Sequence, residues 1–588
     1  MPALLCVPIM VQDEPTSLAD AHAARDAGAD LVEFRIDEFF SGLPDAQGNL
    51  DQREVAAVLR IVARSPLPCI VTCRSAAEGG HYDGDETARV SLYERLGTAG
   101  VGSSVAAASG AEHPPRYLDF EYAAYTRSAN LRQKVNLAVD HPRQRRDVRT
   151  GLILSMHDFE SRPRDLLRRL ADMQAEPAAS IVKAAYTVRS IRDNLELLDL
   201  AAENTGPPLI ALGMGRFGLM SRVLAPKFGG FLTFASLRRE SATAPGQPTL
   251  RELLDTYRFR SIHPGTRVFG LIGWPVEHSL SPLVHNAGFD TLAPDEWDPA
   301  EGDSAALDGV YLPMPVPPEY EHFKATLSAF IDHPRLDFCG CSVTIPHKQH
   351  LVRFARERSA AGDDLAWEID ALAAASGAAN TLVVQRDRVG LAVKARVLNT
   401  DAAAAVSCLE SALNGSARGR RITLIGAGGV ARAIAAGLLE AGASVLVAAR
   451  TRANAEALAA DLRASGIGEG AGASISAADL DAASNSPCDA LVNCTPVGMS
   501  GGPDPKSSPV NMADVRRASP DAVIMDTVYN PLNTPLLEQA GLAGLKTLDG
   551  LRMFVAQAAD QFEAWTGRPA PVGLFDRICR EALSVSER

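Results

Sequence analysis

Residues 421–450 read RITLIGAGGVARAIAAGLLEAGASVLVAAR, and this stretch sets the class of the C-terminal half. An apolar β-rich run leads through a glycine-rich turn into an amphipathic helix and a second apolar run, which is the βαβ pattern of a parallel sheet. Glycines at such a turn let a pyrophosphate approach the helix N-terminus closely. A glycine-rich turn alone is as often structural, but this context predicts a Rossmann-type dinucleotide-binding domain.

The tip of the second strand indicates which dinucleotide is bound. The strand ends in AARTR (448–452), so Arg450, Thr451 and Arg452 stand where an NAD-binding fold needs an acidic residue for the ribose hydroxyls. Guanidinium groups suit the 2′-phosphate of NADP instead. The alternative interpretation is that these are solvated charges after a strand. We expect NADP as the cofactor.

Toward the N-terminus, residues 1–255 repeat a short β-rich run followed by an amphipathic helix. Eight such runs begin at residues 4, 31, 68, 116, 151, 180, 208 and 231. Eight strands alternating with helices predict an α/β fold, a closed (β/α)8 barrel, in which chemistry takes place at the C-terminal ends of the strands. The polar residues at or just beyond those ends are Glu33, Arg35, Arg74, His157, Lys183 and Arg222.

Lys183 lies inside the apolar run SIVKAAYTV (180–188). The ordinary interpretation is a strand-end lysine that snorkels to solvent. In a barrel, a desolvated lysine near cations loses its proton more easily and can attack a ketone, and the iminium acidifies the adjacent carbon. His157, at a neighbouring strand end, can take that proton, and arginines on the same rim suit a carboxylate. The pattern predicts a Schiff-base site.

Composition excludes several classes of protein. The chain has 588 residues, with 58 Lys+Arg against 71 Asp+Glu, a net charge of −13. Such an acidic chain lacks the positive field of nucleic-acid and anionic-membrane binders, and no apolar run is long enough for a transmembrane helix. Nine cysteines form neither a disulfide framework nor a ligand cluster. We expect a cytoplasmic enzyme with small-molecule substrates, no nucleic-acid or membrane partner and no metal.

Six stretches of the N-terminal half together resemble the type I dehydroquinate dehydratases. They are EFRID (33–37), TCRSAAEGG (72–80), SMHDF (155–159), IVKAA (181–185), GMGRFGLMSR (213–222) and APGQ (244–247). The resemblance implies that Lys183 forms the imine, that His157 removes the ring proton and helps expel the hydroxyl, and that Glu78 pairs with His157. It also implies that the substrate is held by Glu33, Arg35, Arg74, Arg222, Thr243 and Gln247. Many members carry serine where this chain has Thr243, which keeps the hydroxyl.

Residues 268–575 resemble the shikimate dehydrogenases. The stretches are GWPVEHSLSPLVHN (273–286), VTIPHK (343–348), GAANTL (377–382), NTD (399–401), NCTPVGM (493–499), DTVYNP (526–531) and GLRMFVAQAADQF (550–562). The resemblance implies a catalytic pair, Lys348 and Asp401, in which the lysine gives a proton to the alkoxide left by hydride transfer. It implies substrate contacts from Ser279, Ser281, Thr344, Asn380, Tyr529 and Gln557. It implies cofactor contacts from Gly426, Ala427, Gly428, Gly429, Val430, Arg450, Thr451, Arg452, Thr495 and Gly550. Leu398 stands where many relatives have a small residue before NTD.

The expected domains are a barrel (1–258), a substrate-binding domain (266–398), an NADP-binding domain (399–549) and C-terminal helices returning to the substrate domain (550–588). An acidic stretch near 290–308 is expected to be a surface loop. Their order is similar to the fused enzyme of plants, but a first strand at Leu4 leaves no room for a transit peptide.

The two halves are expected to catalyse successive steps, dehydration of 3-dehydroquinate and reduction of 3-dehydroshikimate to shikimate. One alternative is an NAD-dependent enzyme that oxidises quinate or shikimate. The other is a regulator built from the same domains that binds the metabolites without turnover. The regulator should have lost catalytic groups, yet Lys183, His157, Lys348 and Asp401 all remain.

Overall fold

The chain divides into two compact units, Met1–Pro264 and Gly265–Arg588, in a computed structural model. The structure describes residues 2–40, 51–98, 114–141, 149–244, 246–292, 308–362 and 364–586. The expected surface loop near 290–308 lies almost wholly outside the described residues.

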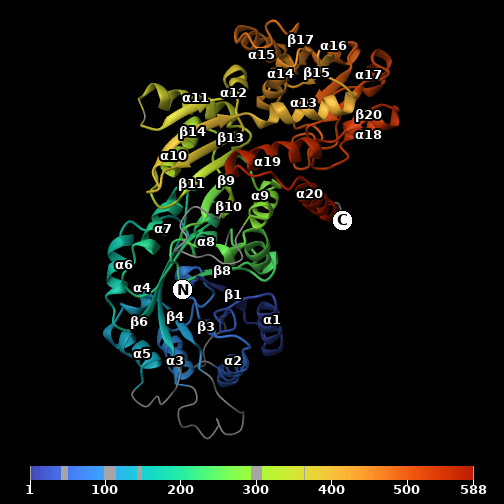
Figure 1. Cartoon of the computed structure of the whole chain (residues 1–588). Coiled ribbons are helices and arrows are strands. Elements are labelled where there is room, and N and C mark those ends of the chain that lie inside the picture. The colour runs from blue at the N-terminus through green and yellow to red at the C-terminus, as the bar shows by residue number, and fades with distance from the viewer. Residues whose placement is uncertain are drawn as a thin grey trace. The chain divides into compact units, whose positions relative to one another are not determined.

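Unit 1 is built on eight parallel strands in the order β7-β6-β5-β4-β3-β2-β1-β8 (Figure 1). The backbone N–H of Phe231 donates to the carbonyl of Leu209 at 2.9 Å and links the last strand to β7. The predicted (β/α)8 barrel is therefore confirmed. Its strands are β1 (Leu4–Met10), β2 (Leu31–Arg35), β3 (Cys69–Thr72), β4 (Tyr117–Glu121), β5 (Gly151–Asp158), β6 (Ala179–Thr187), β7 (Leu209–Met214) and β8 (Leu232–Phe234).

The helices of unit 1 cover the outside of these strands (Figure 1). The helix α2 shows why they form: Val55, Val58 and Val62 make one buried apolar stripe, and Asp51 accepts a hydrogen bond from an N-terminal amide. The helices are α1 (Glu14–Asp26), α2 (Gln52–Arg64), α3 (Glu86–Gly97), α4 (Tyr122–Tyr125), α5 (Ala129–Val139), α6 (Leu166–Gln174), α7 (Asp193–Ala202) and α8 (Leu219–Val223).

The barrel interior is divided along its axis. One apolar layer includes side chains from seven of the strands, namely Cys6, Leu31, Ile70, Ile153, Ile181, Ile210 and Leu232. These residues fill the interior, so the polar residues of the same strands gather beyond them, at the C-terminal ends. The register pairs Ser155 of β5 with Lys183 of β6, and His157 with Ala185.

Unit 2 contains two six-stranded sheets. The first is mixed, in the order β10-β9-β11-β13-β14-β12, and the second has the order β17-β16-β15-β18-β19-β20 with every pair parallel. The second order is that of a Rossmann fold, which confirms the prediction from residues 421–450. The strands are β9 (Arg267–Gly273), β10 (Gly309–Pro315), β11 (Phe338–Val343), β12 (Ala366–Ile369), β13 (Thr381–Arg386), β14 (Ala392–Leu398), β15 (Arg421–Ile425), β16 (Ser444–Ala448), β17 (Ser474–Ala478), β18 (Ala490–Asn493), β19 (Val523–Asp526) and β20 (Lys546–Leu548).

The helix α19 returns from the second sheet to the first. Its Trp565 donates a hydrogen bond to the carbonyl of Leu382 in β13, at 2.9 Å. The helices of unit 2 are α9 (Ser281–Asp290), α10 (Tyr320–Asp332), α11 (Lys348–Ala360), α12 (Ala371–Ser376), α13 (Thr400–Leu413), α14 (Gly429–Glu440), α15 (Arg452–Ala464), α16 (Leu480–Asn485), α17 (Met512–Ala518), α18 (Pro535–Leu542), α19 (Gly550–Thr566) and α20 (Val572–Ser586).

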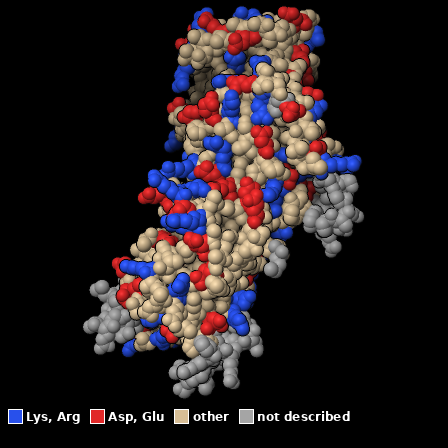
Figure 2. Space-filling view, turned by 90° about the vertical axis from the view of Figure 1, so that its left-hand side faces the viewer, with Lys and Arg blue, Asp and Glu red and all other residues tan. Residues whose placement is uncertain are grey.

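The surface is charged in a mixed pattern. Basic and acidic side chains are interspersed over the face drawn in Figure 2. Within the described residues, none of the helices has the length and apolar character needed to cross a membrane.

Candidate active sites

One cavity at the C-terminal ends of the barrel strands brings together every site residue predicted for unit 1. The lining includes Glu33, Arg35, Arg74, Glu78, His157, Lys183, Arg222, Thr243 and Gln247. These residues come from six different strands or from the segments that follow them, so the barrel closure is what makes them neighbours.

Lys183 is a buried ammonium group held by acidic and aromatic neighbours. Its Nζ donates to Asp119 Oδ2 at 3.1 Å and lies 3.9 Å from Glu33 Oε1. The same nitrogen lies 4.5 Å from the centre of the Phe234 ring. Thr72 in turn donates to Glu33 Oε1 at 2.6 Å and fixes that carboxylate. The lysine is therefore oriented into the cavity before any substrate binds.

His157 and Glu78 form a hydrogen-bonded pair in the same cavity. Glu78 Oε2 lies 3.0 Å from His157 Nδ1 and also accepts the backbone N–H of His157 at 3.0 Å. Burial lowers the pKa of His157 well below its usual range, and the nearby cations of Arg74 and Lys183 act in the same direction. A neutral imidazole whose Nδ1–H donates to the carboxylate leaves Nε2 to accept a proton. Burial raises the pKa of Glu78 to about 7.

Two buried groups in the cavity have unused hydrogen-bonding capacity. Arg222 is 2% exposed, its Nε has no hydrogen-bond partner among the described residues, and burial lowers the pKa of its guanidinium to about 10. Gln247 Nε2 is also buried without a partner in the part of the chain that the structure describes. Both groups can donate to an anionic, oxygen-rich ligand, since a buried donor left unpaired is costly. Arg35, by contrast, is already held by Asp37 through two bonds of 2.9 Å.

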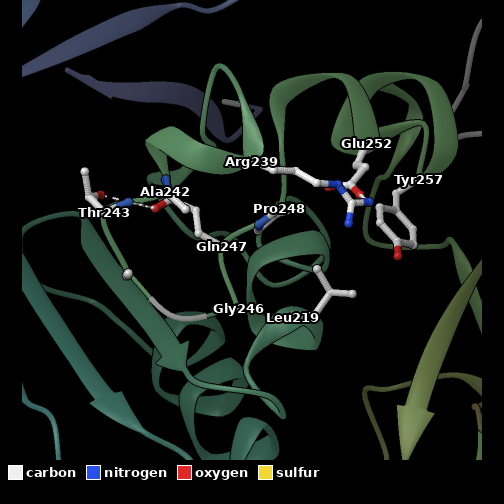
Figure 3. Close-up of a pocket in the computed structure, with 10 residues that line it drawn as sticks. Leu219, Arg239, Ala242, Thr243, Gly246, Gln247, Pro248, Glu252 and Tyr257 are labelled. Carbon is white, nitrogen blue, oxygen red and sulfur yellow. Dashed lines mark hydrogen bonds and ion pairs between the residues drawn. The ribbon is translucent and has the colours of Figure 1, made fainter. Parts of the chain in front are cut away.

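The segment after β8 supplies the last predicted residues. Gln247 Oε1 accepts from the backbone N–H of Thr243 at 3.1 Å and from its hydroxyl at 3.2 Å. Figure 3 shows these two side chains turned toward each other in a neighbouring pocket, which shares Thr243, Ala244 and Gln247 with the cavity and is also lined by Arg239 and Glu252. Thr243 thus holds the carbonyl end of Gln247 and leaves its amide donor for a ligand.

Three further groups at this site were not predicted from the sequence. Asp119 Oδ1 accepts from Arg74 at 2.7 Å and from Ser155 at 2.6 Å, and Glu121 lies 3.5 Å from Arg74. Burial alone would raise the pKa of Asp119, but the charges of Arg74 and Lys183 outweigh it and hold that pKa well below its usual range. The available signal was two acids at alternate positions of the run RYLDFEY (116–122), at a strand end where barrels place their chemistry.

In unit 2, Lys348 and Asp401 form a buried ion pair. The distance from Lys348 Nζ to Asp401 Oδ2 is 2.6 Å, and the two side chains are 10% and 8% exposed. Lys348 begins α11, and Asp401 lies in the first turn of α13. A short charge-assisted bond between two helix starts fixes the ammonium group in one position.

The predicted substrate contacts fall into small hydrogen-bonded groups. Asn380 donates to Thr400 Oγ1 at 2.9 Å and to Gln557 Oε1 at 3.3 Å. Ser279 donates to Ser281 at 3.1 Å. The Tyr529 ring packs against Phe554 in a tilted arrangement with 4.7 Å between ring centres, and burial raises the pKa of Tyr529 to about 12, opposed by the Ser279 hydroxyl. Thr344 follows β11, where its N–H donates to the carbonyl of Ile272. No hydrogen bond between described residues joins Thr344 to these groups.

The predicted dinucleotide residues meet at the C-terminal edge of the parallel sheet. Gly426 (φ +112°) precedes α14 next to Thr495, and a Cβ on Gly426 would lie 3.0 Å from Thr495 Cγ2. Ala427 and Gly428 complete the turn, Val430 lies in the first turn of α14, and a Cβ on Gly428 would meet open space. A Cβ on Gly429 would lie 3.3 Å from Lys348 Cβ, so the turn borders Lys348. Gly550 begins α19 against the carbonyl of Val528.

Arg450 is exposed and has no ion-pair partner within the described part of the chain, whereas Arg452 pairs with Glu456 at 2.8 Å. Thr451 is the N-cap of α15. An open glycine turn at a helix N-terminus, with a free guanidinium at the tip of the next strand, fits a phosphorylated dinucleotide.

Fold and sites define a chain of two enzyme units, a barrel with a buried lysine–histidine pair and a dinucleotide-dependent unit with a lysine–aspartate pair. Family models agree. Residues 5–264 match type I 3-dehydroquinase, and residues 271–382 match the substrate-binding domain of shikimate dehydrogenase. Residues 408–474 match shikimate/quinate 5-dehydrogenase, and residues 550–577 match the C-terminal domain of shikimate 5′-dehydrogenase.

Relatives match along nearly the whole chain. A bifunctional 3-dehydroquinate dehydratase/shikimate dehydrogenase, named as chloroplastic, from Arabidopsis thaliana is 33% identical over 98% of this chain and 84% of its own length. A shikimate dehydrogenase (NADP(+)) from Methanocella arvoryzae is 36% identical over 54% of this chain and 99% of its own. The solved dehydroquinate dehydratase and shikimate dehydrogenase from S. pombe is 24% identical, with a TM-score of 0.39 over 98% of each chain. The chain belongs to the family of bifunctional 3-dehydroquinate dehydratase/shikimate dehydrogenases.

Proposed function

We propose that the chain catalyses two successive reactions, dehydration of 3-dehydroquinate to 3-dehydroshikimate in unit 1 and reduction of 3-dehydroshikimate to shikimate with NADPH in unit 2. The observation that carries the proposal is that Lys183 and His157 line one cavity in unit 1, while Lys348 and Asp401 form a nearly buried ion pair in unit 2. The product of the first reaction is the substrate of the second.

In the dehydratase, the amine of Lys183 attacks the ketone, and loss of water gives an imine that stabilises negative charge on the neighbouring carbon. Nε2 of His157 takes the proton from that carbon, and the protonated imidazole then gives a proton to the departing hydroxyl. Glu78 holds the ring in the required tautomer. Hydrolysis of the imine frees the product and restores the lysine. Arg222 and Gln247, whose donors are unpaired, bind the carboxylate and hydroxyl groups of the substrate.

Borohydride in the presence of 3-dehydroquinate tests this mechanism. We expect reduction of the imine to leave a permanent adduct on Lys183, seen by intact mass and peptide mapping, with loss of dehydration and retention of reduction. Lys183→Ala should give no adduct, and His157→Ala should still be trapped while turning over poorly. Absence of an adduct on the unmutated protein under turnover conditions would contradict the imine.

In the reductase, the residues present fit an NADP cofactor, because a Cβ on Gly428 would meet open space and Arg450 is exposed, with no ion-pair partner among the described residues. Bound NADPH supplies a hydride to the substrate ketone. Lys348 holds a proton at Nζ for the oxygen that becomes the new hydroxyl, and Asp401 fixes the position of that ammonium group. Asn380 and Gln557, which are hydrogen-bonded to each other, and the Ser279–Ser281 pair orient the ring hydroxyls and the carboxylate.

A coupled assay tests the whole proposal. Supplied with 3-dehydroquinate and NADPH, the protein should consume NADPH and produce shikimate. Lys183→Ala should abolish the coupled reaction but not the reduction of added 3-dehydroshikimate, and Lys348→Ala should do the reverse. A substitution in one unit that removes both activities from a folded protein would contradict the independence of the two sites.

We also propose the division into 1–258, 266–398, 399–549 and 550–588, and a cytosolic location. All nine cysteines are free, which suits a reducing compartment. The Arabidopsis relative is named as chloroplastic, so fractionation of cells that express the tagged full chain is the test. Recovery in an organelle would contradict the location.

A further inference from the structure

A row of buried charges of alternating sign leads away from Lys183 through the barrel wall. Asp119 contacts Lys183 at 3.1 Å and Arg74 at 2.7 Å. Arg74 lies 3.5 Å from Glu121, and the other oxygen of Glu121 accepts from Arg89 at 2.6 Å. The row therefore joins the lysine to a residue of α3.

Arg89 is unusual because it is fully buried yet does not line the cavity. Its Nη1 donates to Glu121 and to the carbonyl of Cys73 at 2.7 Å. Its Nε and Nη2 form a bidentate pair with Glu86 at 2.6 and 2.7 Å, and its guanidinium lies 4.5 Å from the centre of the Phe120 ring. A cation with this many partners is held rigidly.

We propose that Arg89 is a positioning residue of the dehydratase: it holds Glu121 so that Arg74 stays on Asp119 and Ser155, and it thereby sets how readily Lys183 releases its proton. The inference rests on the proposed function, because only an imine mechanism requires a free amine on Lys183.

The sign of the effect follows from the contacts. Without Arg89, Arg74 would be the remaining cation that lowers the pKa of Glu121, beside backbone N–H groups such as that of Ser75. The potential at Lys183 would become more negative, and Arg74 would be drawn from Asp119 toward Glu121. Both changes stabilise the ammonium form of Lys183, so imine formation would require a higher pH. Removal of the charge of Glu121 would act in the opposite direction.

Other charged and titratable groups facing Lys183 stay unchanged in this comparison. They are Asp119 on β4, Glu33 on β2, His157 on β5, Arg74 after β3 and Cys6 on β1, together with Arg35, Glu78 and Arg222, which line the same cavity. Because none of them is substituted, a shift in the pH dependence reports the Arg89–Glu121 pair.

The test compares Arg89→Gln, Glu121→Gln and the double variant, using the pH dependence of borohydride trapping at Lys183 and of kcat/KM for dehydration. Arg89→Gln should move the acidic limb up, and Glu121→Gln should move it down. Each shift should be about one pH unit, which a unit charge roughly 10 Å away produces inside a protein. The double variant should return close to the unmutated profile.

Arg162→Gln is the matched control, since it removes an arginine whose pair with Glu196 lies on the outside of the same barrel, at 2.6 Å. It should leave the profile in place, and reductase activity should be unaffected throughout. If Arg89→Gln does not fold, Arg89→Lys replaces it in the comparison. Because Arg89→Lys keeps the charge, it should keep the pH midpoint of borohydride trapping, whereas Glu121→Gln should lower that midpoint.

Trapping with the same midpoint in the unmutated protein and in Glu121→Gln would overturn the role of Arg89 and leave the imine mechanism intact. Absence of trapping in the unmutated protein at every pH would instead overturn the proposed function.

Discussion

Replacement of Asp401 by asparagine keeps the shape of the side chain and removes the charge that faces Lys348. The two groups are 2.6 Å apart and nearly buried, so their bond is charge-assisted and little screened. Such a bond is worth about 1.5–3 kcal/mol, and about 1.4 kcal/mol corresponds to a tenfold change in rate. Loss of the bond that holds the Lys348 amine should therefore slow reduction at least tenfold.

In the proposed mechanism Lys348 gives the proton and Asp401 holds this lysine in position, so the loss should appear in kcat for reduction. At neutral pH we expect kcat to fall by ~10²–10⁴, the effect of a lost acid–base group. The assay follows loss of NADPH with added 3-dehydroshikimate across pH, with dehydration of 3-dehydroquinate as the control for folding. An unchanged kcat in a folded variant would refute the pairing argument, and loss of dehydration would refute the independence of the units.

Three further predictions concern the cofactor, the dehydratase pair and the glycine turn. Arg450→Ala should raise KM for NADP(H) about ten- to hundredfold and leave KM for NAD(H) nearly unchanged. If steady-state kinetics give the unmutated protein an equal or higher kcat/KM with NAD(H) than with NADP(H), the quinate-oxidising alternative would be favoured instead. Burial raises the pKa of Glu78 from 4.5 to about 7, so the folded state disfavours the charged carboxylate. The free energy of unfolding of unit 1 should therefore be highest below about pH 4.5 and fall as pH rises through about 7, by up to roughly 3 kcal/mol. Glu78→Gln should remove that loss, measured by hydrogen exchange of barrel peptides, and an equal loss in both proteins would contradict it. Gly429→Ala places a Cβ 3.3 Å from Lys348 Cβ. Because a small misplacement of a catalytic group slows the reaction, kcat for reduction should fall about tenfold. An unchanged kcat would show that Lys348 can move aside.

Both folds were predictable from the sequence because the local spacing of apolar residues indicates their strands and helices. Eight β-rich runs alternating with helices predict a barrel, and GAGG between a strand and a helix predicts the dinucleotide domain. Each strand–helix unit of these patterns spans about 30 residues, and within such a length the strand and helix periods can be recognised. Lys183 and His157 were also accessible, since each lies at a strand end and the barrel places all such ends on one face.

The electrostatic setting of those residues was decided only by the tertiary structure. Asp119 binds Arg74, 45 residues away, and Lys183, 64 residues away, and nothing in the run RYLDFEY distinguishes its acids from solvated ones. Arg89 looks like any surface arginine of an amphipathic helix until it is seen to be buried against Glu121. The sequence by itself determined which groups are present and on which elements, because spacing along the chain sets secondary structure. Which charges face each other, and what that does to a proton, depends on distances between strands and on burial, which exist only once the barrel has closed.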